Sequence, residues 1–186
     1  MKHPFKRDDA LRVATEILDV LKPVTERIEI CGSLRRGKPE VSDIEILYIP
    51  KIGLSNDDLF NPSPKDMTAA EIERMVESGL LSKRSNTRGS FTWGNLNKLS
   101  IHNASGIPVD LFCEPRQDDW WRSVVIRTGS ADFNIRLITT AAKHGVKVHA
   151  YNTGLTDNVG NPIVCKSEED FFKICHMPWK LPYQRV

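Results

Sequence analysis

The sequence predicts an α+β protein, with a sheet-based domain over residues 1–117 and a smaller C-terminal subdomain over residues 118–186. Three observations lead to this prediction. Short β-branched runs follow a helical stretch in the first half, helical spacing returns in the second half, and the composition is ordinary for a globular protein. With 186 residues, the chain has room for one domain and a small appendage.

The first half alternates helical and strand patterns. Apolar residues at helical spacing predict a helix over residues 8–21, which Pro23 ends. Alternating, β-branched residues predict strands over 27–31 and 43–49. Prolines and asparagines without periodicity predict a surface loop over 51–66.

The middle and the end of the chain carry further elements. Thr68 and Glu71 have the spacing of a capping box, which predicts a helix over 68–81 with Thr68 as its N-cap. Three more elements are expected, namely strands over 91–101 and 107–112 and a helix over 132–144.

The overall charge, the hydropathy and the cysteines indicate which partners and which compartment to expect. With 26 Lys+Arg against 24 Asp+Glu, the net charge of +2 points to no particular partner. No apolar stretch approaches the roughly 20 residues that cross a bilayer, so no membrane association is expected. The four cysteines are scattered, which favours reduced thiols and a cytoplasmic protein.

The most informative segment is residues 32–45, because it joins a basic, glycine-containing turn to a pair of acids. Asp43 and Glu45 lie two positions apart on a predicted strand, so their side chains face the same side. Two carboxylates so close repel each other unless a divalent cation lies between them. Asp110, an acid in an apolar strand, is the candidate for a third ligand. A two-cation site of this kind suits phosphoryl or nucleotidyl transfer.

Each feature also has an ordinary structural explanation. An acid pair in a strand usually marks a solvated face, and an acid in an apolar strand is often a hydrogen-bonded structural residue. Arg35 and Arg36 taken alone would be surface charge. The combination of these features in this order favours the transferase site.

The residues Gly32-Ser33, Arg36-Gly37 and Asp43-x-Glu45, with Asp110 on a later strand, resemble the motifs of the nucleotidyltransferase superfamily. Thr128-Gly129-Ser130 followed by Phe133-Asn134 resembles the C-terminal motif of family X DNA polymerases, the DNA polymerase β-like group. The resemblance runs from about residue 8 to residue 185 and is weak across 51–90. It implies a minimal form with a nucleotidyltransferase palm, in which helices flank a mixed β-sheet, and a thumb-like C-terminal subdomain.

The resemblance also implies a role for each matching residue. Asp43, Glu45 and Asp110 would be the catalytic carboxylates and would bind two Mg²⁺ ions, or Mn²⁺. The residues that would bind the incoming deoxynucleoside triphosphate are Gly32, Ser33, Arg36, Ser42, Gly129 and Asn134. Ser33, Arg36 and the Ser42 N–H would meet the phosphates, Gly129 the sugar, and Asn134 the base.

Three features depart from the family pattern. Glu45 stands where the family usually has Asp. Ile126 and Arg127 precede the Thr-Gly-Ser motif where vertebrate members often carry an aromatic pair, which leaves the choice between deoxy- and ribonucleotides open. About 42 residues precede Asp43, so we expect no N-terminal lyase region.

Basic residues indicate where DNA would bind. Residues 82–109 contain four cations and no acid, and residues 119–186 also carry more bases than acids. A solvated basic surface is the alternative explanation. The candidate DNA contacts are Lys83, Arg84, Arg88, Lys98 and Arg136.

These features predict a monomeric, DNA-directed DNA polymerase of family X type that acts in DNA repair on primer-template or gapped DNA. The first alternative is a template-independent nucleotidyltransferase that acts on RNA, protein or a small molecule. The second is a nucleic-acid-binding module that has lost its chemistry. The complete set of three acids argues against the binding module, and the Thr-Gly-Ser motif favours the polymerase.

Overall fold

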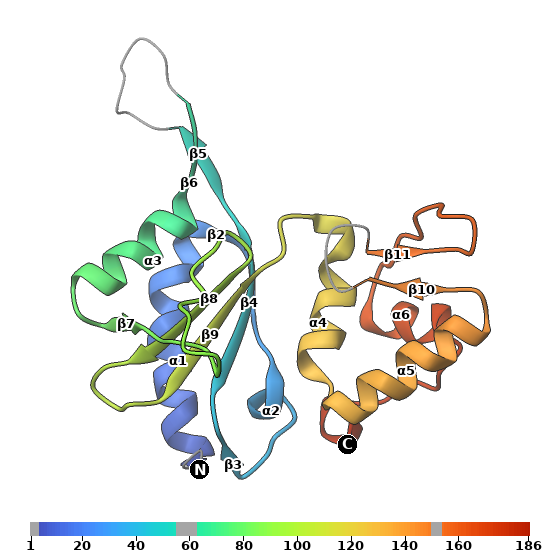
Figure 1. Ribbon diagram of the computed structural model, residues 1–186, viewed down its shortest axis with the longest axis horizontal. Helices are drawn as coiled ribbons and strands as arrows, with labels where there is room; N and C mark the ends of the chain where they lie inside the picture. Colours follow the sequence, from blue (N-terminus) through green and yellow to red (C-terminus); the bar gives the residue numbers. More distant parts are fainter. Residues whose placement is uncertain (1–3, 55–62, 150–153) are drawn as a thin grey trace.

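The computed structural model describes residues 4–54, 63–149 and 154–186, and it confirms the predicted α+β class (Figure 1). The first part contains, in order, β1 (Phe5–Lys6), α1 (Arg7–Leu21), β2 (Thr25–Ile30), α2 (Gly32–Arg35), β3 (Glu40–Val41), β4 (Ile44–Pro50), β5 (Ile52–Leu54), β6 (Pro64–Asp66), α3 (Met67–Glu77), β7 (Leu81–Lys83), β8 (Asn97–His102) and β9 (Pro108–Cys113). The second part contains α4 (Trp120–Thr128), α5 (Ala131–Lys143), β10 (Lys147–Val148), β11 (Leu155–Thr156) and α6 (Glu168–Ile174). Within these three ranges, no helix combines the length and the apolar character that a membrane span requires.

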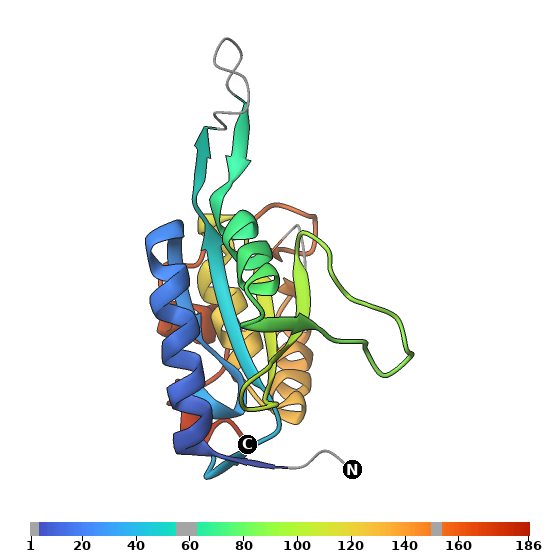
Figure 2. The same ribbon diagram turned by 90° about the vertical axis from the view of Figure 1, so that its left-hand side faces the viewer.

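In the described chain, five strands form a central mixed sheet in the order β2-β4-β9-β8-β7. β4 and β9 pair in parallel, and the other neighbours in this sheet pair antiparallel. Figures 1 and 2 show α1 and α3 on one face of the sheet. Side chains alternate along β4, so Ile44, Ile46 and Tyr48 are buried in the core beneath these two helices.

The opposite face of the sheet carries Glu45, Leu47 and Ile49 from β4. Leu47 and Ile49 pack with Phe112 of β9 and with Val124 of α4. The predicted acids therefore share one surface of the sheet with the apolar contact to α4.

The C-terminal part has a core of its own, in which Phe133 of α5 packs with Phe172 of α6. α4 contributes Val125 to this core, whereas the preceding Val124 packs on the sheet. Because α4 packs on both cores, the boundary predicted at residue 117 stays a prediction.

The prediction of a surface loop over 51–66 is wrong at both of its ends. β5 and β6 pair antiparallel there, with Ile52 opposite Asp66 and Leu54 opposite Pro64. Each strand has three residues, which is too short for a visible periodicity. Residues 55–62 lie outside the described part of the chain.

The capping box predicted for α3 is also wrong. The N-cap is Asp66, whose side chain accepts a hydrogen bond from the Ala69 N–H at 2.8 Å. Thr68 is fully buried, and its hydroxyl donates to the Val24 carbonyl instead. A carboxylate two residues earlier therefore takes the role that the sequence assigned to the hydroxyl.

Candidate active site

The three predicted carboxylates come together because β4 and β9 are parallel neighbours. Glu45 lies directly opposite Asp110 in the register of the two strands, and Asp43 immediately precedes β4. Burial raises the pKa of Glu45 to about 7, and the negative charge of Asp43 adds to the rise. Arg127 opposes the rise, Asp110 adds to it, and Arg36 opposes it. Asp43 and Asp110 therefore lie close enough to disfavour the ionised form of Glu45.

The donor set fits a divalent cation, although the described residues contain no ready-made cluster of three metal-binding side chains. Carboxylate oxygens are the ligands that Mg²⁺ and Mn²⁺ prefer. Besides burial, the charges of Asp43 and Asp110 raise the pKa of Glu45, and a cation at this face would balance these charges. The Asp110 carboxylate accepts a hydrogen bond from Arg84, so one of its oxygens already has a partner.

Gly32 allows the turn after β2 to approach Glu45. Its φ of +64° is in the left-handed region, which favours glycine. A Cβ atom at this position would lie 2.7 Å from Glu45 Oε1. Both the backbone conformation and the space beside the carboxylate therefore require glycine.

Two of the three residues predicted to meet the phosphates, Ser33 and Arg36, lie on this turn. The Ser33 hydroxyl and Arg36 Nε are buried, and neither has a hydrogen-bond partner in the part of the chain that the structure describes. Arg36 Nη1 donates to the carbonyls of Thr128 and Gly129, at 2.6 and 3.0 Å. Burial lowers the pKa of Arg36, whereas Glu45 and Asp43 act in the opposite direction. Arg36 thus links the acids to the Thr-Gly-Ser motif, and Ser42 lies half-buried just before Asp43.

Gly129 and Asn134 are neighbours at the start of α5. A Cβ atom on Gly129 would lie 2.4 Å from Asn134 Oδ1, so glycine is required for this approach. Asn134 Nδ2 donates to the Ile126 carbonyl at 2.7 Å, and its buried Oδ1 has no hydrogen-bond partner among the described residues. The Ser130 side chain caps α5 by accepting from the Phe133 N–H. This motif therefore holds Asn134 beside the carbonyls that Arg36 contacts.

A buried ion-pair group, which the sequence does not predict, joins the two parts of the chain. Arg35 donates to both Glu168 oxygens, at 2.8 and 3.0 Å, and to the Thr128 hydroxyl at 3.0 Å. Arg185, which is fully buried, also donates to Glu168 at 3.0 Å. Burial raises the pKa of Glu168, but hydrogen bonds from Arg35 and Arg185 outweigh it and hold that pKa below its usual range. No sequence signal pairs Arg35 with a residue so far along the chain.

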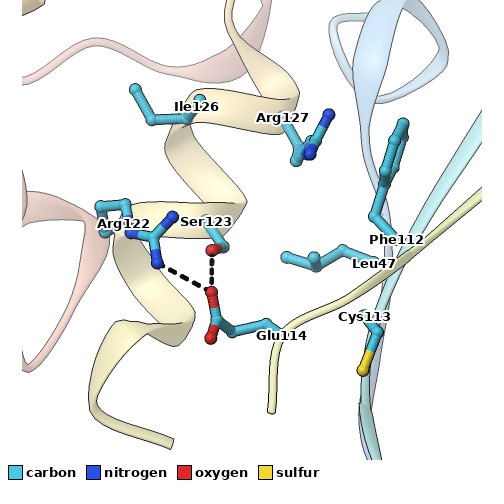
Figure 3. Close-up of a pocket in the computed structure, with 8 residues that line it drawn as sticks. All are labelled: Leu47, Phe112, Cys113, Glu114, Arg122, Ser123, Ile126 and Arg127. Atoms are coloured by element: carbon cyan, nitrogen blue, oxygen red, sulfur yellow. Dashed lines mark hydrogen bonds and ion pairs between the residues drawn. The ribbon is translucent and has the colours of Figure 1, made fainter. Parts of the chain in front are cut away.

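Arg127 reaches the sheet from the last turn of α4 (Figure 3). Its guanidinium carbon lies 3.6 Å from the centroid of the Phe112 ring. A cavity of about 120 Å³ lies beside this contact, and Glu114 in its wall accepts hydrogen bonds from Arg122 and Ser123. Arg127, which the sequence marks only as a departure from the family pattern, thus brings positive charge near Glu45.

The predicted DNA contacts are in different environments. Lys98 is 5% exposed and donates to the Gly94 carbonyl at 2.9 Å, so its charge does not face solvent here, and its contact with DNA stays a prediction. Arg84 pairs with Asp110 rather than presenting its charge to solvent. Lys83 lies over the Trp93 ring and near Glu73.

The other two candidates, Arg88 and Arg136, are exposed, and their contact with DNA also stays a prediction. Arg136 lies on α5 and donates to the carbonyl of Val186.

The fold and the site together define a palm-like mixed sheet that is joined to a thumb-like helical part. Residues 123–186 match the family model described as DNA polymerase beta thumb. The chain is also similar to DNA polymerase lambda of Rattus norvegicus, with 24% identity over 164 residues, which are 83% of this chain and 28% of that protein. These findings confirm the resemblance to family X DNA polymerases. Because the chain spans less than a third of that relative's length, the relative's activity remains a proposal here.

The change Glu45→Gln is expected to alter how stability depends on pH. The pKa of Glu45 is about 7 in the folded chain, above its ordinary value of 4.5. As the pH rises, the unfolded chain loses this proton first, so wild-type stability falls between about pH 4.5 and pH 7, and the loss is complete above that window. Glutamine cannot ionise and escapes this loss.

The measurement is thermal unfolding with a chelator present. At about pH 8 the variant should melt at a higher temperature than the wild type, and at about pH 4 the difference should vanish. The exposed Glu40→Gln serves as the control, because no such pH-dependent difference is expected there. An equal difference at both pH values would contradict the raised pKa.

Proposed function

We propose that this chain is a DNA-directed DNA polymerase of family X type, which adds deoxynucleotides to a primer 3′-hydroxyl in gapped or recessed DNA during repair. The observation that carries the proposal is the parallel register of Glu45 and Asp110 beside the turn that ends in Arg36. Three acids and the arginine that would bind phosphate thereby meet on the surface that faces the thumb-like part. The match of that part to a polymerase thumb model supports the proposal.

In this proposal, Asp43, Glu45 and Asp110 hold two Mg²⁺ or Mn²⁺ ions. When bound, such ions stabilise the charge that develops on the phosphate oxygens. The primer 3′-oxygen forms a bond to the α-phosphorus of the nucleotide while the bond to the bridging oxygen breaks, and pyrophosphate leaves. Asp110 helps to draw the hydroxyl proton away from the primer.

The nucleotide pocket of the proposal uses donors that lack a partner. The Ser33 hydroxyl and Arg36 Nε are buried without an acceptor among the described residues, and triphosphate oxygens would satisfy both. The N–H of Ser42, next to the acids, would bind a further phosphate oxygen. Gly129 would lie against the sugar, and the Asn134 amide would reach the base edge.

The test is primer extension on gapped DNA, with each nucleotide alone and all four together, with and without a template strand. The expected result is addition of the templated deoxynucleotide in the presence of Mg²⁺, with pyrophosphate released. The change Asp43→Asn provides the inactive control, because it removes a carboxylate from the proposed cation site. The same reactions with ribonucleotides measure the sugar choice that Ile126 and Arg127 leave open.

Two results would overturn this assignment in different ways. Extension that ignores the template would support a template-independent nucleotidyltransferase. If the wild type and Asp43→Asn are equally inert on every acceptor while both still bind DNA, the result would support a nucleic-acid-binding module.

A further inference from the structure

Arg84 is held in place at three points beside the acid face of the sheet. Its N–H donates to the Leu99 carbonyl at 2.9 Å, and its Nε donates to the Ser100 carbonyl at 3.4 Å. Its Nη2 donates to Asp110 Oδ1 at 2.5 Å. Both partners of this ion pair are mostly shielded from solvent, with 22% of the Arg84 side chain and 15% of the Asp110 side chain exposed.

The sheet itself fixes this geometry. Leu99 of β8 lies directly opposite Asp110 of β9, so the carbonyl that anchors the Arg84 backbone belongs to the residue paired with Asp110. A planar guanidinium that binds two acceptors has little freedom to turn. Arg84, which directly follows β7, is therefore held against the sheet where it reaches Asp110 and is not a loose surface charge.

We propose that Arg84 is the positioning residue of Asp110, an inference that rests on the proposed polymerase function. By holding Oδ1, the guanidinium directs the second carboxylate oxygen, Oδ2, toward the primer hydroxyl. Its positive charge also balances part of the negative charge on this face before a cation binds. The sequence assigned Arg84 to a DNA phosphate, and the two roles predict different defects.

Measurements of turnover and of DNA affinity distinguish a positioning role of Arg84 from a contact with a DNA phosphate. Loss of a residue that orients Asp110 should lower turnover by about 10–100-fold, as is typical when a residue that orients a metal ligand is lost. The affinity for DNA should stay nearly unchanged. Loss of a phosphate contact weakens DNA binding in a salt-dependent manner and spares turnover.

Cation binding by the protein without DNA gives a second readout. The positive charge of Arg84 repels an incoming cation, so Arg84→Ala should bind Mn²⁺ at least about threefold more tightly than the wild type. Lysine keeps the charge but cannot bind the Ser100 carbonyl and Asp110 in the same fork. Arg84→Lys should therefore bind Mn²⁺ within about twofold of the wild type, while its turnover stays about tenfold lower.

The experiment compares wild type, Arg84→Ala and Arg84→Lys by Mn²⁺ titration of the DNA-free protein and by single-nucleotide insertion kinetics. Arg12→Ala is the matched control, because Arg12 also pairs with an aspartate, Asp9, but lies on α1 beyond the opposite face. It should change neither measurement. Thermal melts establish that each variant is folded. If Arg84→Ala does not fold, the turnover of Arg84→Lys distinguishes the positioning role from a phosphate contact.

Two results would overturn the proposal: Mn²⁺ binding by Arg84→Ala that is unchanged or weaker, or a loss that lies in salt-dependent DNA affinity. A wild type that extends no primer would instead overturn the proposed function. The Mn²⁺ titration would then still decide whether Arg84 balances the acids. Tighter binding by Arg84→Ala but not by Arg84→Lys supports that part, and equal binding by all three proteins overturns it.

Discussion

The change Asp110→Asn should lower the rate of nucleotide insertion by about 10³-fold or more, which corresponds to about 4 kcal/mol of transition-state stabilisation. Asparagine has the same shape but carries no negative charge, and it cannot help to accept the proton of the primer hydroxyl. The loss should appear in turnover measured in a single insertion event, whereas binding of DNA and nucleotide should change little.

The fold of this variant should remain intact. Asp110 raises the pKa of Glu45, so removal of its charge relieves repulsion on the acid face. The amide oxygen of asparagine can still accept the hydrogen bond from Arg84. Asp19→Asn, the same change at an exposed position on α1, is the control and should insert nucleotides like the wild type. An Asp110→Asn protein that retains even a tenth of the wild-type rate would remove Asp110 from the chemistry.

The second large effect concerns stability. The change Glu168→Ala should destabilise the chain by about 3–5 kcal/mol, because it leaves the buried guanidinium of Arg185 without its counter-charge. Arg35 loses its bidentate partner in the same step, so the contact between α2 and α6 weakens as well. Denaturant unfolding, followed by far-ultraviolet circular dichroism, measures the change.

Glu169→Ala is the control for this prediction, because the neighbouring carboxylate is exposed and lies in the same first turn of α6. Its effect should stay within about 0.5 kcal/mol. The pKa of Glu168 is held below its ordinary value of 4.5, so its contribution is complete above that pH and is lost as the pH falls through the folded-state pKa. The difference between Glu168→Ala and the wild type should therefore shrink in acid. A difference that is constant down to low pH would show that packing, rather than charge, is lost.

Local patterns in the sequence were sufficient to predict much of the fold. The helical spacing over 8–21 and the alternation over 43–49 each reflect one apolar face, and both elements form close to the predicted bounds as α1 and β4. α6 was missed because seven residues are barely two turns. Its start is nevertheless marked, since Ser167 caps the helix and three acids follow.

The features of the candidate site also differ in whether they follow from neighbouring residues or from contacts between distant parts of the chain. The spacing of Asp43 and Glu45 already indicates a shared face, whereas the register that brings Asp110 opposite Glu45 comes from strands far apart in the chain. The pairing of Arg84 with Asp110 and of Arg35 with Glu168 also depends on tertiary packing. Their residue types alone indicated surface charge, because isolated arginines are usually solvated.

The double packing of α4 restricts how the two parts of this chain can move relative to each other. Successive residues of a helix point about 100° apart, and here the consecutive residues Val124 and Val125 enter two different cores. A turn of α4 about its own axis would withdraw both side chains from their cores at once. Motions that preserve both contacts are therefore small tilts or slides of the whole helix, with the bending confined to the connections that precede and follow it.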